Sequence, residues 1–178
     1  MVSLGRTAKR FHSTIVKENG QPFLGTIMPV GEGKVPSYDF STPRLLLRTT
    51  EPHTVSARSI ILDDTRQRYI VADHGHSAMG GHFTYRLFQV TADLQWTRTR
   101  KETDPLTGIE KTVEQQDLGV IPCLIEMMGR EYPDRATQLT EETRRVIAAA
   151  DLQLGDQLDD AVVRRVDRAL GVTYAEIS

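Results

Sequence analysis

The feature that most constrains this chain is a strict alternation of apolar and polar side chains between Phe88 and Trp96. Apolar residues hold the even positions and polar residues the odd ones. Residues two apart on a β-strand point to the same face, so this period is typical of a strand with one face in a core and one in water. Short apolar runs bounded by turn residues are typical of further strands; they lie at 44–48, 55–62, 68–72, 118–125, 162–166 and 172–177. The sequence predicts a mainly β protein.

A long polar hairpin is predicted directly after the alternating strand. Residues 97–103 keep Thr at β-favoured positions but carry no apolar side chain, and residues 109–116 are nearly as polar. The segment 104–108, Asp-Pro-Leu-Thr-Gly, has the residues that cap, start and close a hairpin turn. An isolated two-stranded ribbon is marginally stable in water. We therefore expect the hairpin around 97–116 to protrude from the core, where it either frays or is held by a partner.

Residues 1–43 differ from the rest in composition. Four basic residues precede the first acidic one, and eight Gly and Pro residues lie between Gly20 and Pro43. This density of Gly and Pro interrupts both helices and sheets. The pattern predicts an extended N-terminal arm that is ordered by a neighbouring subunit, followed by a single small antiparallel β-barrel over residues 44–178.

At most one short helix is expected. Residues 137–150 contain good helix formers, with acidic residues near the start of the segment. Their apolar stripe is weak, and a strand over 144–149 is the alternative.

Composition and cysteine content limit the function classes. The 178 residues include 22 basic and 24 acidic side chains, for a net charge of −2, which does not suit a strongly basic nucleic-acid binder. The single cysteine, Cys123, allows neither an intramolecular disulfide nor a cysteine-based zinc cluster, and it suits a reducing compartment. The first residues lack a signal peptide's apolar stretch, and no apolar run is long enough to span a membrane. We expect a soluble protein made in the cytoplasm, with no membrane partner.

Three histidines are the best candidates for metal chemistry. His74 and His76 would share one side of a strand, with Asp73 before them and His82 six residues on. The glycines around them favour a solvated loop instead. No nucleophile elbow or phosphate loop is present, and Cys123 lies in an apolar run typical of a core. We therefore predict no enzyme and no cofactor, and keep a small metal-binding β-barrel enzyme using residues 73–82 as the alternative from another class.

Three segments together resemble the head–tail connector (neck) proteins of tailed bacteriophages, of the head-closure or stopper type. One is residues 63–71, a turn that leads into Tyr-Ile-Val; another is 88–108, from Phe-Gln-Val through Trp96 and Arg98 to the Asp-Pro-Leu-Thr-Gly turn; the third is 152–166, with Gly155-Asp156 before the closing valine strand. The resemblance covers roughly residues 60–178.

The resemblance implies a structural virion protein, assembled in the host cytoplasm. It would form a homo-oligomeric ring in the neck, sixfold or twelvefold, between a portal or adaptor protein and a tail-terminator or tail protein. Packaged double-stranded DNA would lie close by without sequence-specific contact. A tail-terminator or other tail-proximal ring protein is the alternative within this class. The residues expected to contact partners lie in the arm and the hairpin: Arg6, Lys9, Arg10, Phe11, Phe23, Arg98, Arg100, Lys101, Asp104, Leu106, Ile109 and Lys111.

Overall fold

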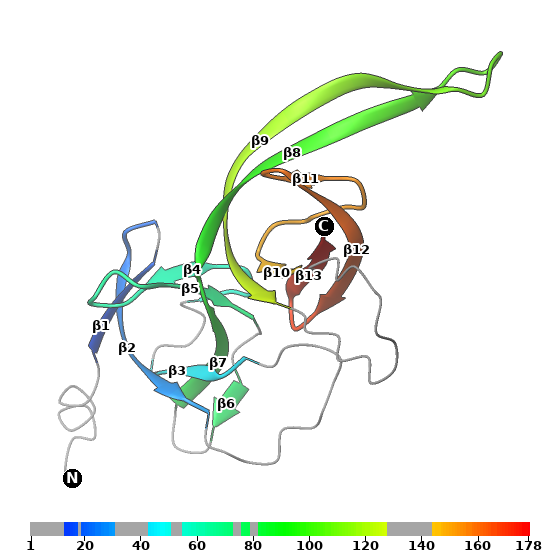
Figure 1. The fold of residues 1–178 in the computed structure, drawn as a ribbon. Helices are drawn as coiled ribbons and strands as arrows, with labels where there is room; N and C mark the ends of the chain where they lie inside the picture. The colour runs from blue at the N-terminus through cyan, green and yellow to red at the C-terminus, as the bar shows by residue number, and fades with distance from the viewer. Residues whose placement is uncertain are drawn as a thin grey trace, which may run out of the picture. The chain divides into compact units, whose positions relative to one another are not determined.

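The computed structural model describes residues 13–17, 19–30, 43–50, 55–72, 76–78, 82–127 and 144–178 (Figure 1). These residues form thirteen β-strands and contain no helix, which confirms the mainly β prediction. The chain divides into two compact units, Met1–Val90 with Leu170–Val172 and Thr91–Ala169 with Thr173–Ser178. Within the described segments, no helix is long and apolar enough to cross a membrane.

The first unit contains a closed, six-stranded antiparallel barrel. Its strands are β1 (Ser13–Lys17), β2 (Pro22–Pro29), β3 (Leu45–Thr49), β4 (Ile60–Leu62), β5 (Arg68–Val71) and β7 (His82–Gln89). They follow the order β3-β2-β1-β4-β5-β7, and β3 pairs with β7 to close the barrel. The short strand β6 (His76–Ala78) also pairs with β7. Buried side chains form the core: Ile15, Phe23, Leu47, Val55, Ile61, Tyr69, Val71, Tyr85 and Leu87.

The prediction of an extended N-terminal arm is wrong for the part of that segment that the structure describes. Residues 13–29 supply β1 and β2 of the first barrel, paired from Ser13 opposite Gly25 to Val16 opposite Pro22. The prolines are tolerated because Pro22 and Pro29 are the end residues of β2. Gly25 is needed where the barrel is crowded, since a Cβ there would lie 2.8 Å from Leu47 Cδ1. Residues 1–12 and 31–42 lie outside the described residues.

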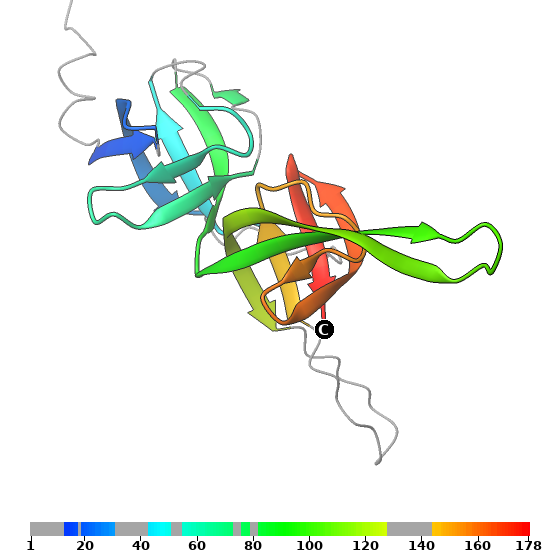
Figure 2. The same ribbon diagram turned by 90° about the horizontal axis from the view of Figure 1, so that it is seen from above.

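The second unit contains the other closed, six-stranded antiparallel barrel. Its strands, in the order β10-β13-β12-β11-β8-β9 around the barrel, are β10 (Arg144–Ala148), β13 (Val172–Ile177), β12 (Ala161–Ala169), β11 (Gln157–Leu158), β8 (Ala92–Thr103) and β9 (Glu110–Met127). The core residues are Leu94, Ile121, Cys123, Val146, Ala148, Leu152, Leu158, Ala161, Val163, Ala175 and Ile177. Figure 2 shows β8 and β9 continuing past this barrel as a hairpin.

Two further expectations about the fold are corrected. The single barrel expected over residues 44–178 is replaced by two barrels, because β1 and β2 complete a first barrel with β3, β4, β5 and β7. Where residues 137–150 are described, they form a strand and not a helix. β10 pairs with β9 and β13, and Val146, Ile147 and Ala148 are all fully buried. Burial on both faces explains why neither an alternating nor a helical stripe was clear in this sequence. Residues 137–143 lie outside the described residues.

Candidate interaction surface

The predicted hairpin is confirmed, and its two strands pair far beyond the second barrel. β8 and β9 pair from Ala92 opposite Cys123 to Thr103 opposite Glu110, with register shifts after Trp96 and after Arg100. β8 pairs with β11 only at Trp96 and Thr97. Beyond Thr97, the described partner of β8 is therefore β9 alone, and the hairpin is a two-stranded ribbon (Figure 1).

A bulge lies where the ribbon leaves the barrel. Trp96 is opposite Gly119 but Thr97 is opposite Asp117, so β9 has one extra residue at this point. Gly119 adopts φ +89°, a left-handed conformation that favours glycine. The Asp117 side chain accepts a hydrogen bond from the Gly119 amide at 2.8 Å. Bulges of this kind bend a strand and increase its twist, so this one marks the change from barrel to ribbon.

A buried carboxylate anchors the base of the hairpin. Asp156, only 1% exposed, accepts hydrogen bonds from Arg98 Nε and Nη2, from Trp96 Nε1 and from the Gln153 amide, all at 2.8–2.9 Å. Arg98 also donates to the Asp151 carbonyl at 3.0 Å, and its guanidinium lies 5.2 Å from the centre of the Trp96 ring. Burial raises the pKa of Asp156, but the hydrogen bonds outweigh it and hold that pKa below 3.8.

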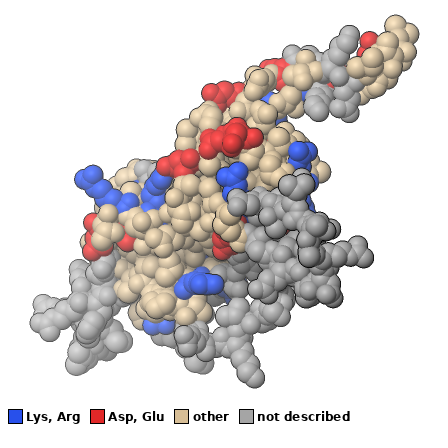
Figure 3. Space-filling view, in the orientation of Figure 1, with Lys and Arg blue, Asp and Glu red and all other residues tan. Residues whose placement is uncertain are grey.

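The hairpin tip presents apolar side chains on a hydrogen-bonded turn. The Asp104 side chain accepts from the Leu106 amide at 2.9 Å, and this bond holds the pKa of Asp104 below its ordinary value. The Gly108 amide donates to the Asp104 carbonyl at 2.8 Å, with Gly108 at φ +67°. Leu106 is 94% exposed and Ile109 is 59% exposed. Figure 3 shows an acidic side chain among uncharged ones at this end of the ribbon.

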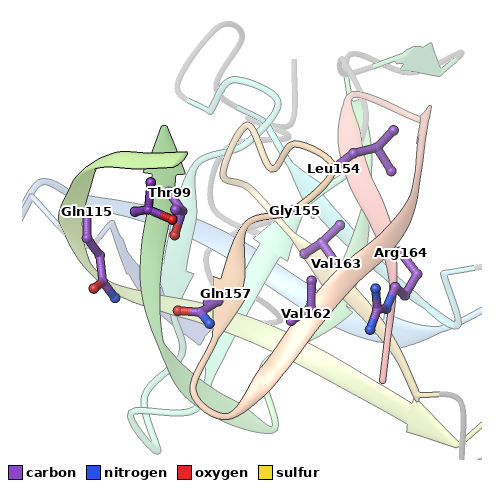
Figure 4. Close-up of a pocket in the computed structure, with 9 residues that line it drawn as sticks. Thr99, Gln115, Leu154, Gly155, Gln157, Val162, Val163 and Arg164 are labelled. Atoms are coloured by element: carbon purple, nitrogen blue, oxygen red, sulfur yellow. The ribbon is translucent and has the colours of Figure 1, made fainter. Parts of the chain in front are cut away.

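An open groove of about 800 Å³ lies between the base of the ribbon and the β11–β12 side of the same barrel (Figure 4). Thr99, Thr112 and Gln115 line it from the hairpin. The residues that line it from the loop before β11 and from β11 and β12 are Leu154, Gly155, Gln157, Val162, Val163 and Arg164. Leu154 is 69% exposed, and Arg164 is also exposed.

The structure separates the predicted partner-contact residues into three groups. Two are engaged inside their own units: Phe23 is buried in the first core, and Arg98 is bound to Asp156. The hairpin residues with described, accessible side chains are Arg100, Asp104, Leu106 and Ile109. Of the rest, Lys101 and Lys111 pair within the ribbon without described side chains, and Arg6, Lys9, Arg10 and Phe11 lie outside the described residues.

The histidines proposed for a metal site are only partly described. His76 is opposite Thr84, and His82, the first residue of β7, is opposite Ala78. His74 lies outside the described residues. Across the described segments, no group of three His, Cys, Asp or Glu side chains is placed to hold a metal ion.

The sequence reasoning missed the groove and the anchor. The segment 152–158 alternates in sequence around a predicted turn at Gly155-Asp156, and in the structure Leu152 and Asp156 are buried while Leu154 is exposed. The cause is the turn at Leu154 and Gly155, where Gly155 adopts φ +84°. The available signal for the anchor was an acidic residue, Asp156, between the apolar Leu154 and Leu158, combined with an Arg two residues after Trp96.

Comparison of the chain with known protein families, curated proteins and solved structures finds no match.

Proposed function

We propose that this protein is a non-enzymatic structural subunit of the neck of a tailed bacteriophage, forming a ring that joins the head to the tail. The observation that carries the proposal is the β8–β9 ribbon, which continues past the barrel and ends on the exposed Leu106 and Ile109. A two-stranded ribbon alone is marginally stable, and exposed apolar side chains at its end are expected when another protein covers them.

The closed barrels explain why contacts between this subunit and its neighbours would use a protruding segment. Where each barrel is closed, its strands are hydrogen-bonded on both sides and offer no free edge for pairing with another chain; β8 and β9 differ only along the ribbon, where each is paired with the other alone. A subunit built this way attaches to neighbours through side-chain surfaces and protruding segments. The ribbon is such a segment, as the resemblance to connector proteins implies.

The charge of the hairpin supports a protein partner in preference to nucleic acid. Residues 97–116 contain four basic and four acidic side chains. Arg98 is bound to Asp156, and Arg100 lies 3.4 Å from Glu102, so these two guanidinium groups already have carboxylate partners. A surface that grips DNA needs several basic groups facing phosphates. This hairpin suits contact with a portal, adaptor or tail protein, and DNA that passes without being held.

Deleting the gene from the phage genome that encodes the chain tests this function. Electron microscopy of the resulting lysate should show filled or emptied heads and separate, normal tails. Addition of the purified full-length protein to that lysate should restore joined, infectious particles. The reason is that a connector acts after head and tail assembly and can be supplied from outside.

Two outcomes would contradict the proposal. Joined heads and tails in the deletion lysate would show that the protein is not needed at the neck. Tails of irregular length would instead support the tail-terminator alternative.

A further inference from the structure

Two surfaces of the second unit match each other in chemistry. Leu106 and Ile109 form an exposed apolar tip, and Leu154 and Val162 provide exposed or partly exposed apolar surface in the groove. Burying such surface stabilises a contact by about 25 cal/mol per Å². Figure 4 shows Leu154, Val162 and Arg164 on one side of the groove and Thr99 and Gln115 of the hairpin on the other.

The tip cannot fill the groove of its own chain. Thr112, which lines the groove, is opposite Lys101, and Leu106 lies five residues further along the ribbon. At about 3.3 Å per residue, the paired strands extend roughly 7 Å beyond that pair to Thr103 and Glu110, and the turn with Leu106 lies further still. The strands remain paired up to Thr103 and Glu110, so the ribbon has no open segment at which to fold back. A hairpin tip that fills this groove must therefore come from another molecule.

The charges of the two surfaces are also complementary. From Thr103 to Ile109, the turn at the tip contains one acidic residue, Asp104, and no basic one. Among the described residues that line the groove, the one charged residue is Arg164, which donates to Ser178 Oγ at 3.3 Å and keeps an exposed side chain. An acidic tip with apolar side chains therefore fits a groove with apolar walls and a basic residue.

We propose that the hairpin tip of one copy binds in the β11–β12 groove of a second copy of the same chain. This contact uses different surfaces on the two copies, so each copy can bind one neighbour at its tip and another at its groove. Repetition of such a contact closes a ring when the rotation between copies allows it. The inference rests on the proposed ring function and names the surfaces that build the ring.

Disulfide trapping between full-length copies tests the contact. One preparation carries Leu106→Cys and the other Leu154→Cys, and the two are mixed under mild oxidation. The native Cys123 is fully buried and contributes no cross-link while the chain is folded. The matched control pairs Leu106→Cys with Val120→Cys, because Val120 is 61% exposed on the same unit but does not line the groove.

The Leu106–Leu154 pair should cross-link about tenfold faster than the control pair, because docking raises the local concentration of the two thiols. The rate advantage should shrink at about 1 M salt, where the Debye length falls to about 3 Å and the attraction of the acidic tip to Arg164 is screened. A chain carrying both cysteines should give a ladder of covalent oligomers.

Equal cross-linking rates for the two pairs would overturn the inference. If the wild-type protein still formed rings in electron micrographs, the connector proposal would stand and only this interface would be wrong. The other combination is fast, specific cross-linking together with normal particles after gene deletion. The tip-to-groove contact would then stand and the connector function would fail.

Discussion

Asp156→Ala is the substitution that most directly tests the anchor at the base of the hairpin. The Asp156 side chain is only 2% exposed and receives two hydrogen bonds from Arg98, one from the Trp96 indole and one from the Gln153 amide. Alanine removes all four acceptor contacts at once. It leaves the strands themselves unchanged, since none of these bonds belongs to a strand ladder.

The expected loss of unfolding free energy follows from what remains after the change. The Trp96 N–H and the Gln153 N–H would lose their acceptor; an unsatisfied buried donor costs about 1–3 kcal/mol, and the cost is smaller for these two because Trp96 is partly buried and Gln153 is exposed to water. Arg98 would lose its carboxylate, although water can partly replace it because the Arg98 side chain is 29% exposed. Breaking a buried ion pair by removing one partner costs about 3–5 kcal/mol, and because Arg98 is partly exposed we expect Asp156→Ala to cost about 3 kcal/mol, the lower end of this range.

Urea denaturation followed by tryptophan fluorescence provides the assay. Trp96 is the only tryptophan in the chain and belongs to the second unit, so its signal reports unfolding of that unit. With a slope of about 1–3 kcal/mol per M, the midpoint should fall by roughly 1–3 M urea. Asp151→Ala is the matched control: its side chain is 56% exposed and pairs with Arg168, so it should cost less than about 1 kcal/mol.

The pH dependence adds a second readout of the same group. The folded pKa of Asp156 is held below 3.8, so its contribution is present above that value and is lost as pH falls through the lower, folded pKa. The difference between wild type and Asp156→Ala should persist down to about pH 4 and shrink below it. Equal effects of Asp156→Ala and Asp151→Ala at neutral pH would refute the view that the buried carboxylate anchors the hairpin.

Three smaller predictions test other parts of the structure. Gly119→Ala should cost about 1–2 kcal/mol in the same urea assay, because φ is +89° there while the space around it is open; no loss would contradict a left-handed bulge. Burial and the hydrogen bond to Asp63 raise the pKa of Tyr69 to about 12. The difference in tyrosinate absorbance between the wild type and Tyr69→Phe should therefore titrate near pH 12, and a midpoint near pH 10 would contradict the contact. Cys123 should react with a thiol reagent only on unfolding, because it is fully buried; rapid labelling of the native protein would be inconsistent with the core.

Local patterns in the sequence were sufficient to predict most of the strands and the hairpin. The Asp104–Gly108 segment forms the predicted turn because its residues suit that turn individually, without help from distant parts of the chain. The turn between β4 and β5 is another example, since the Asp63 side chain accepts from Thr65 and Gln67 within four residues.

The number of barrels could not be predicted in the same way. Alternation shows that one face of a strand is buried, but it does not show in which core that face is buried. The alternation from Phe88 to Trp96 has the expected burial, with Phe88, Val90 and Leu94 buried and Gln89, Thr91 and Asp93 exposed. However, β7 ends at Gln89 in the first unit and β8 begins at Ala92 in the second. One continuous pattern therefore belongs to two different barrels.

The groove could not be predicted from local sequence patterns, because it forms through pairing between distant parts of the chain. Thr99 and Leu154 come together because β11 pairs with β8 at Thr97 and because Asp159 and Gln95 exchange two hydrogen bonds. The Gly- and Pro-rich segment was misread for a similar reason. Gly25 and Pro22 look like interruptions locally, and only the packing of β2 against β1 and β3 shows why they are accepted.

Immunogold labelling of purified virions with an antibody against the full chain tests the central claim most directly. The connector account predicts gold at the junction of head and tail in intact particles, and none on heads and tails from the gene-deletion lysate. Gold along the tail, at its far end or on the head shell, or no gold on any intact virion, would contradict it.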